Sequence, residues 1–152
     1  LLNMGPAVSY TSNSEVDPIP LTWRAGFAYN VFNLHSHRLV LTADMNKETL
    51  TFDKEGEPDA FYVSAFKGWT NESLNTTFEQ IMYNTGIEYT WSNMFSLRFG
   101  YLDDAPGQRT EFDFGLGFLM SELLQADVAI IKDLSGNEVR DLQTRFSLAF
   151  LF

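Results

Sequence analysis

The chain ends in the sequence Arg145-Phe146-Ser147-Leu148-Ala149-Phe150-Leu151-Phe152, and this stretch decides the fold class. Side chains in a strand alternate between two faces, so Phe146, Leu148, Phe150 and Phe152 share one face. Arg145 and Ser147 begin the opposite, more polar face. This pattern is typical of the closing strand of an outer-membrane barrel, whose apolar face meets lipid and whose end carries an aromatic residue at the membrane boundary.

The composition agrees with strands of this kind. The 152 residues suffice for a single domain, with 45 % hydrophobic and 15 % aromatic residues. Mean hydropathy is only −0.14, and no apolar run is long enough to predict a transmembrane helix. In a barrel wall each apolar outward residue is offset by a polar inward one, which gives this neutral average. The net charge of −10 argues against nucleic-acid binding, and the lack of Cys excludes disulfides and thiolate metal sites.

Alternation along the rest of the chain predicts further amphipathic strands. In the segment 110–120, for example, Phe112 and Phe114 share a face opposite Glu111 and Asp113. The eight predicted strands are 2–11, 20–31, 37–46, 81–91, 94–102, 110–120, 123–132 and the terminal strand. The sequence therefore predicts an all-β, antiparallel transmembrane barrel with about eight strands in one domain, 1–152. The opening residues show no signal segment, so we expect either a removed signal or a start inside a larger protein.

The connections between these strands differ in length in a regular way. Outer-membrane barrels have short periplasmic turns and longer extracellular loops. With Phe152 at the periplasmic end, every long connection falls outside and every short one falls in the periplasm. The long connections are 12–19, 47–80, 103–109 and 133–143, and the short ones are 32–36, 92–93 and 121–122.

The insertion 47–80 is too long for a plain hairpin loop. Its first part is charged, and Asn71 to Tyr83 is predicted to form a short helix, with Leu74, Phe78, Ile81 and Met82 at helical spacing. We expect the insertion to fold over or into the mouth of the barrel. Aromatic groups on a long outside loop need a partner or a folded cover. The predicted partner-binding residues are Phe61, Tyr62, Phe66 and Trp69.

Charged residues recur on the predicted inward faces. They are Arg24, Asp44, Glu88, Arg98, Glu111, Asp113, Asp127 and Arg145. An ion-paired network that satisfies these lumen charges is favoured over a polar path or a seat for a partner segment. Glu111 and Asp113 are adjacent on one face because of alternation, which does not make them a catalytic pair.

Other sequence patterns give little evidence for a metal site or a catalytic site. His35 and His37 lie in a short turn without further converging ligands, so a metal site is not predicted. Asp103-Asp104 and the segment 133–138 do not match the calcium-loop spacing, and ordinary turn chemistry is favoured there. The sequence lacks a phosphate-binding glycine loop and a nucleophile motif. We therefore predict no enzyme activity, no cofactor and no metal.

The order of several strand motifs resembles the PorV family. The resemblance is carried by Asn3-Met4-Gly5-Pro6, by the segments 21–29 and 43–47, by Gly86-Ile87-Glu88-Tyr89 with the segment 93–101, and by the segments 114–118 and 145–148. The segment 93–101 is the most specific, and the match around 66–78 is loose. PorV proteins are related to FadL-type outer-membrane transporters and have about 14 strands, so the chain resembles the C-terminal part of such a barrel.

The resemblance implies a role in the type IX secretion system of the bacterial outer membrane. PorV-like proteins carry secreted cargo from a SprA-like translocon to a PorU-like attachment complex. The implied partners are therefore those proteins and outer-membrane lipid, reached through the extracellular loops. Two alternatives stay open: a FadL-like transporter of hydrophobic small molecules, and a complete, small eight-strand barrel with a structural role.

Overall fold

The computed structural model describes residues 2, 19–70, 74–121, 123–136 and 141–150. The chain divides into two compact units, which we describe separately. The first unit combines Leu1–Ala25 with Met45–Ile81, and the second combines Gly26–Asp44 with Met82–Phe152.

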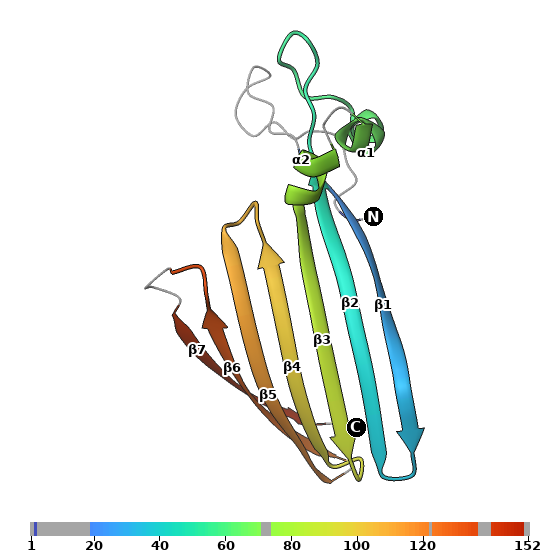
Figure 1. Ribbon diagram of the computed structural model, residues 1–152, viewed down its shortest axis with the longest axis vertical. Coiled ribbons are helices and arrows are strands. Elements are labelled where there is room, and N and C mark those ends of the chain that lie inside the picture. The colour runs from blue at the N-terminus through green and yellow to red at the C-terminus, as the bar shows by residue number, and fades with distance from the viewer. Residues whose placement is uncertain (1, 3–18, 71–73, 122, 137–140, 151–152) are drawn as a thin grey trace. The chain divides into compact units, whose positions relative to one another are not determined.

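The described residues form one antiparallel sheet in which each strand pairs with the next along the chain (Figure 1). The strand order is β1-β2-β3-β4-β5-β6-β7. The strands are β1 Leu21–Leu34, β2 His37–Thr49, β3 Ile81–Trp91, β4 Phe95–Asp104, β5 Arg109–Ser121, β6 Leu124–Asp133 and β7 Leu142–Phe150. The all-β, antiparallel prediction is therefore confirmed, and seven of the predicted strands lie within a few residues of the observed ones.

The eighth predicted strand, 2–11, lies outside the described residues apart from Leu2. The Leu2 amide donates to the Thr22 carbonyl oxygen at 2.9 Å, and the Thr22 amide donates to the Leu2 carbonyl oxygen at 3.1 Å. Within the described part of the chain, no pairing joins β7 to β1. The sheet is not closed by these residues, so the barrel itself stays a prediction.

The first two strands extend three residues beyond their predicted C-terminal ends. β1 extends to Leu34 and β2 to Thr49, whereas the expected ends were 31 and 46. The extension of β2 carries Lys47, the first residue of the predicted insertion 47–80. Lys47 is buried. Its charged group is satisfied there, because Nζ donates to Gln80 Oε1 at 2.6 Å and lies 5.5 Å from the centre of the Trp69 ring.

Two helices lie in the connection between β2 and β3. The helix α1, Phe61–Thr70, was not predicted. The helix α2, Leu74–Glu79, falls inside the predicted 71–83 but is shorter, because Ile81 and Met82 begin β3. Neither described helix is long and apolar enough to pass through a bilayer.

The first unit has a small interior formed by α1 and the adjoining strand ends. Its buried apolar side chains are Leu21, Ala65 and Ile81. The Trp23 indole Nε1 donates to the Ala65 carbonyl oxygen at 3.2 Å, and the Trp23 ring meets Trp69 edge-on at 6.2 Å. These contacts fix α1 against the start of β1.

Short turns join the strands of the second unit at one end, and longer ones at the other. Residues 35–36 and 92–94 connect successive strands at the short-turn end, and residues 105–108 connect β4 to β5 at the opposite end (Figure 1). Ser92 and Asn93 adopt φ of 55° and 56°, and the Met94 amide donates to the Trp91 carbonyl oxygen at 3.1 Å. Two successive positive φ angles match a tight turn to the twist of its hairpin.

Candidate functional site

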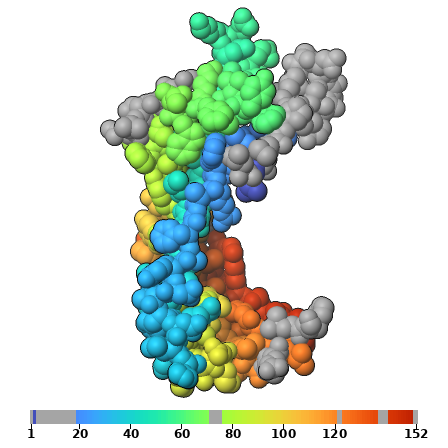
Figure 2. Space-filling model, turned by 90° about the vertical axis from the view of Figure 1, so that its right-hand side faces the viewer, coloured from blue at the N-terminus to red at the C-terminus, as the bar shows by residue number. Residues whose placement is uncertain are grey.

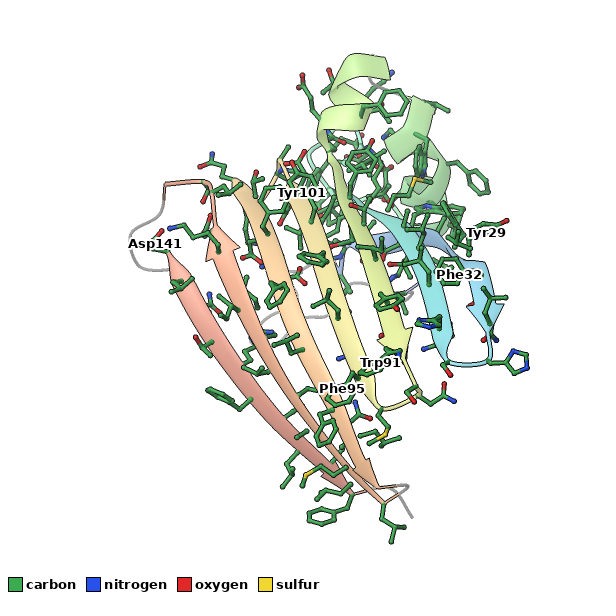
Figure 3. The ribbon with its side chains drawn as sticks, turned by 60° about the horizontal axis from the view of Figure 1, so that its bottom comes forward. Tyr29, Phe32, Trp91, Phe95, Tyr101 and Asp141 are labelled. Carbon is green, nitrogen blue, oxygen red and sulfur yellow. The ribbon has the colours of Figure 1, made fainter. Side chains whose placement is uncertain are left out.

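One face of the second unit, here called the apolar face, carries aromatic and aliphatic side chains from β3 to β7. The register places these residues opposite one another on adjacent strands: Tyr89, Trp91, Phe95, Leu97, Phe99, Tyr101, Phe112, Phe114, Leu116, Phe118, Ala126, Val128, Ile130, Phe146, Leu148 and Phe150. Figure 3 shows Trp91 beside Phe95 at the short-turn end, with Tyr101 near the other end of β4. The face thus extends along the length of the strands.

Aromatic pairs bridge neighbouring strands on the apolar face. Ring centroids are 5.6 Å apart for Trp91 and Phe95 and 4.7 Å apart for Phe95 and Phe118. Phe99 packs with Phe114 at 5.1 Å. Cross-strand aromatic contacts of this kind stabilise a sheet, but they leave the outer surface of each ring uncovered. Phe146, for example, is 80 % exposed.

The opposite face, here called the polar face, holds the residues of the second unit that are buried. Among the described residues of this unit, these are Thr90, Gly115, Gly117 and Asp133. The buried apolar side chains described in the chain all belong to the first unit. The second unit therefore buries polar residues and glycine, whereas the aromatic residues of its apolar face are exposed or part-exposed, which inverts the arrangement of a water-soluble sheet.

An alternating chain of charges crosses the polar face. Arg38 Nη2 and Arg98 Nε each donate to a different oxygen of Glu88 at 2.7 Å. Arg98 Nη1 also donates to Asp127 Oδ1 at 2.6 Å, and Gln125 Nε2 donates to Asp127 Oδ2 at 2.8 Å. We call Arg38, Glu88, Arg98 and Asp127 the ion-pair chain. It joins β2, β3, β4 and β6.

The ion-pair chain skips β5 because of a glycine. Arg98 is on β4 and Asp127 is on β6, and Gly117 of β5 lies between them. A Cβ atom added to Gly117 would be 2.6 Å from Asp127 Oδ1 and 3.2 Å from Arg98 Nη1. The missing side chain lets the two charged groups meet directly above the backbone of β5.

The predicted lumen charges fall into three groups. Glu88, Arg98 and Asp127 form ion pairs, as the network interpretation predicted. Glu111 lies 3.7 Å from Arg109, Asp44 accepts from Asn84 Nδ2 at 2.9 Å, and Arg145 donates to Gln143 at 3.5 Å. Asp113 lies over Gly100, and Arg24 belongs to the first unit.

Sequence reasoning missed Arg38 and Gln125 as members of this site. Arg38 of β2 pairs with Glu88 of β3, and Gln125 bonds to Asp127 two residues along its own strand, β6. Strand alternation gives the face of a residue and not the register, so the contacts could not be predicted.

The histidines and turn carboxylates are not brought together into a metal site. His37 is the first residue of β2, not part of a turn, and its Nδ1 lies 2.6 Å from the Tyr89 hydroxyl. Asp104 accepts from the Gly107 amide at 3.0 Å, and Asp133 accepts from the Ser135 amide at 2.7 Å, which is turn chemistry. Over the described ranges, no group of three ligating side chains has the arrangement of a metal site.

The predicted partner-binding residues all lie on α1 of the first unit, but they differ in exposure. Phe66 is 72 % exposed and Tyr62 is 63 % exposed, and Phe61 is also on the surface. Trp69 is only part-exposed because it packs edge-on against Trp23, and its contact with a partner stays a prediction. Its role is to hold α1 in place.

Residues 52–59 form a short turn that we call the acidic hairpin, in which Phe52 bridges to Pro58. Lys67 of α1 bonds to it. Lys67 Nζ donates to Asp59 Oδ2 at 2.5 Å and to the Phe52 carbonyl oxygen at 2.7 Å. The hydrogen bonds that Asp59 accepts from Lys67 and from the Thr51 hydroxyl lower the pKa of its carboxyl below the ordinary 3.8.

Comparison with known proteins does not place the chain in a family. No family model matches the sequence, and no curated protein matches it significantly.

Proposed function

We propose that the second unit is part of the wall of a transmembrane β-barrel in a bacterial outer membrane. In this arrangement the apolar face meets lipid and the polar face lines the interior. The observation that carries the proposal is the inverted burial of the second unit, whose described buried residues are Thr90, Gly115, Gly117 and Asp133.

In water the sheet of the second unit would lack a second layer against its apolar face. A sheet needs an apolar face packed against another layer to be stable by itself in water. Here the face that could supply this burial is exposed, and contiguous apolar patches beyond a few hundred Å² are rare on soluble monomers. Lipid satisfies such a face without any protein layer, while the ion-pair chain satisfies charges on the other side.

We further propose that the barrel acts in protein secretion of the type IX kind and is not an enzyme. The support is the resemblance of the ordered strand motifs to PorV proteins, together with the exposed aromatic side chains of Phe61, Tyr62 and Phe66 on α1. Secreted cargo, a SprA-like translocon and a PorU-like complex are the proposed partners. Exposed aromatic groups are frequent in the cores of such interfaces.

Membrane insertion is tested by expressing the chain in a bacterial host and fractionating the envelope. We expect it in the outer membrane, resistant to extraction by alkaline carbonate. Phe99→Arg should prevent insertion, because it places a charge in lipid at a cost of about 2–4 kcal/mol. Ser96→Arg, on the polar face of the same strand, should still insert. Carbonate-soluble protein that forms dimers through the apolar face would contradict the proposal.

The secretion role is tested by substituting the exposed residues of α1. Tyr62→Ser with Phe66→Ser should reduce partner co-purification and the release of cargo to the medium. Phe78→Ser is the matched control, because Phe78 is 59 % exposed but belongs to α2. Normal cargo release by the double variant would refute the role of α1 while leaving membrane insertion intact.

A further inference from the structure

The polar face contains a cavity that the proposed function does not use. It has a volume of about 490 Å³ and lies at the short-turn end of the second unit. Its lining includes Arg38, Arg98, Glu88, Asn93 and Gln125. This volume falls within the range of small-molecule sites, about 300–1,000 Å³. In Figure 2 the sheet of the second unit is curved and not flat, from the blue strands β1 and β2 round to the orange and red strands β6 and β7.

The charged residues in the lining of this cavity are two arginines and one carboxylate. Two guanidinium groups, those of Arg38 and Arg98, converge on the single carboxylate of Glu88. Asp127 neutralises Arg98 from the β6 side but is not part of the lining. Arg38 is therefore the end of the ion-pair chain, and among the described side chains Glu88 is the carboxylate that it contacts.

The geometry of Arg38 suits a second oxyanion. A guanidinium presents five N–H donors in a planar fork, and Arg38 uses Nη2 for Glu88. Its side chain is 43 % exposed, so the group can be reached by a ligand. The side-chain amide of Asn93 adds a neutral donor to the same cavity, whereas the Gln125 amide already donates to Asp127.

We infer that this cavity binds a small molecule bearing a carboxylate or phosphate group, with Arg38 as the main anion contact. The ion-pair chain holds the guanidinium of Arg98 in place through two carboxylates, and it orients Glu88 toward Arg38. The bound anion would take the N–H groups of Arg38 that do not donate to Glu88. The site is formed within the second unit, so the inference does not depend on membrane insertion or on secretion.

The test uses the full chain in detergent micelles and isothermal titration calorimetry at constant ionic strength. Succinate and inorganic phosphate are the two oxyanion probes, and succinamide is the neutral analogue of succinate. We expect succinate, phosphate or both to bind, and succinamide not to bind. The stronger probe shows whether the natural ligand is a carboxylate or a phosphate compound. Equal binding of succinate and succinamide, or no binding of either anion at millimolar concentration, would overturn the inference.

Matched variants locate the binding. Arg38→Gln should weaken the affinity at least about tenfold, because it removes a charge-assisted contact. Arg145→Gln makes the same change of charge on the polar face outside the cavity lining, and it should change the affinity less than about twofold. Arg38→Lys keeps the charge and should bind with intermediate affinity. Equal losses in Arg38→Gln and Arg145→Gln would show a general field effect and refute the site.

Discussion

Replacing Gly117 with alanine places a methyl group where the Asp127 carboxylate now lies. The added Cβ would be 2.6 Å from Asp127 Oδ1, which is far inside normal contact distance. Gly115, two residues earlier on the same strand and face, is the matched control. There the nearest atom would be Arg98 Cβ at 3.5 Å, which is ordinary van der Waals contact.

The magnitude follows from the difference between the two sites. Replacing glycine by alanine reduces the entropy of the unfolded chain, a stabilisation of about 0.4–1 kcal/mol that is common to both variants. At Gly117 the charged groups must move apart, which loses an ion pair worth about 0.2–1 kcal/mol and adds a crowding cost of about 1–3 kcal/mol. Because these side-chain ends can move, we expect Gly117→Ala to be about 1–2 kcal/mol less stable than Gly115→Ala.

The assay is urea unfolding of both variants in detergent micelles, followed by tryptophan fluorescence. Adding Asp127→Ala to each variant removes the clashing carboxylate, so the difference between the two glycine sites should fall below about 0.5 kcal/mol. Equal stabilities of Gly117→Ala and Gly115→Ala would refute the claim that Gly117 makes room for the ion-pair chain. A difference that persists without Asp127 would place its cause elsewhere.

Three further predictions concern the packing of α1, the acidic hairpin and a tight turn. Trp23→Phe removes the hydrogen bond to Ala65 and part of the contact with Trp69. It should lower the free energy of unfolding by about 1–2 kcal/mol, measured by urea unfolding followed by circular dichroism. A decrease below about 0.3 kcal/mol would count against this packing. Because the pKa of Asp59 is lowered in the folded state, its carboxylate contributes stability that is present above pH 3.8 and is lost as the pH falls through the folded pKa. Asp59→Asn should therefore flatten the acid limb of the plot of unfolding free energy against pH. An unchanged acid limb would contradict the contacts of Asp59 with Lys67 and Thr51. Ser92→Val forces a β-branched residue to φ of 55° and should cost about 1–3 kcal/mol in the same unfolding assay, whereas Ser92→Gly should cost nothing; equal effects of the two would argue against this backbone conformation.

Most of the sheet could be predicted from the sequence because strand alternation is a direct consequence of backbone geometry. The segment 81–91 was predicted as a strand and is β3, Ile81–Trp91, since Tyr83, Ile87, Tyr89 and Trp91 share a face. The two faces of the second unit follow from the same rule. The partners within the ion-pair chain do not, because they depend on register and on a glycine of β5 between them.

The helix α1 was missed because its buried side is made of small residues. Ser64 and Ala65 are buried, and Gly68 lies against the side chain of Thr49, while Phe66 points to the surface. A search for large apolar residues at helical spacing follows the buried face of an ordinary amphipathic helix. In α1 the large apolar residues lie on the exposed side, so their spacing in the sequence did not predict this helix.

The most direct test of the central claim is the environment of alternate residues in the reconstituted membrane. The chain has no cysteine, so spin labels can be attached to single cysteine variants without a background. Labels at Leu97, Phe99 and Val128 report on the apolar face, and labels at Ser96 and Gln125 report on the polar face. Collision rates with lipid-soluble oxygen and with a water-soluble nickel chelate are measured at each position. We predict high oxygen and low nickel collision rates at the first three positions and the reverse at the other two, whereas nickel access to Leu97, Phe99 and Val128 would contradict a lipid-facing sheet.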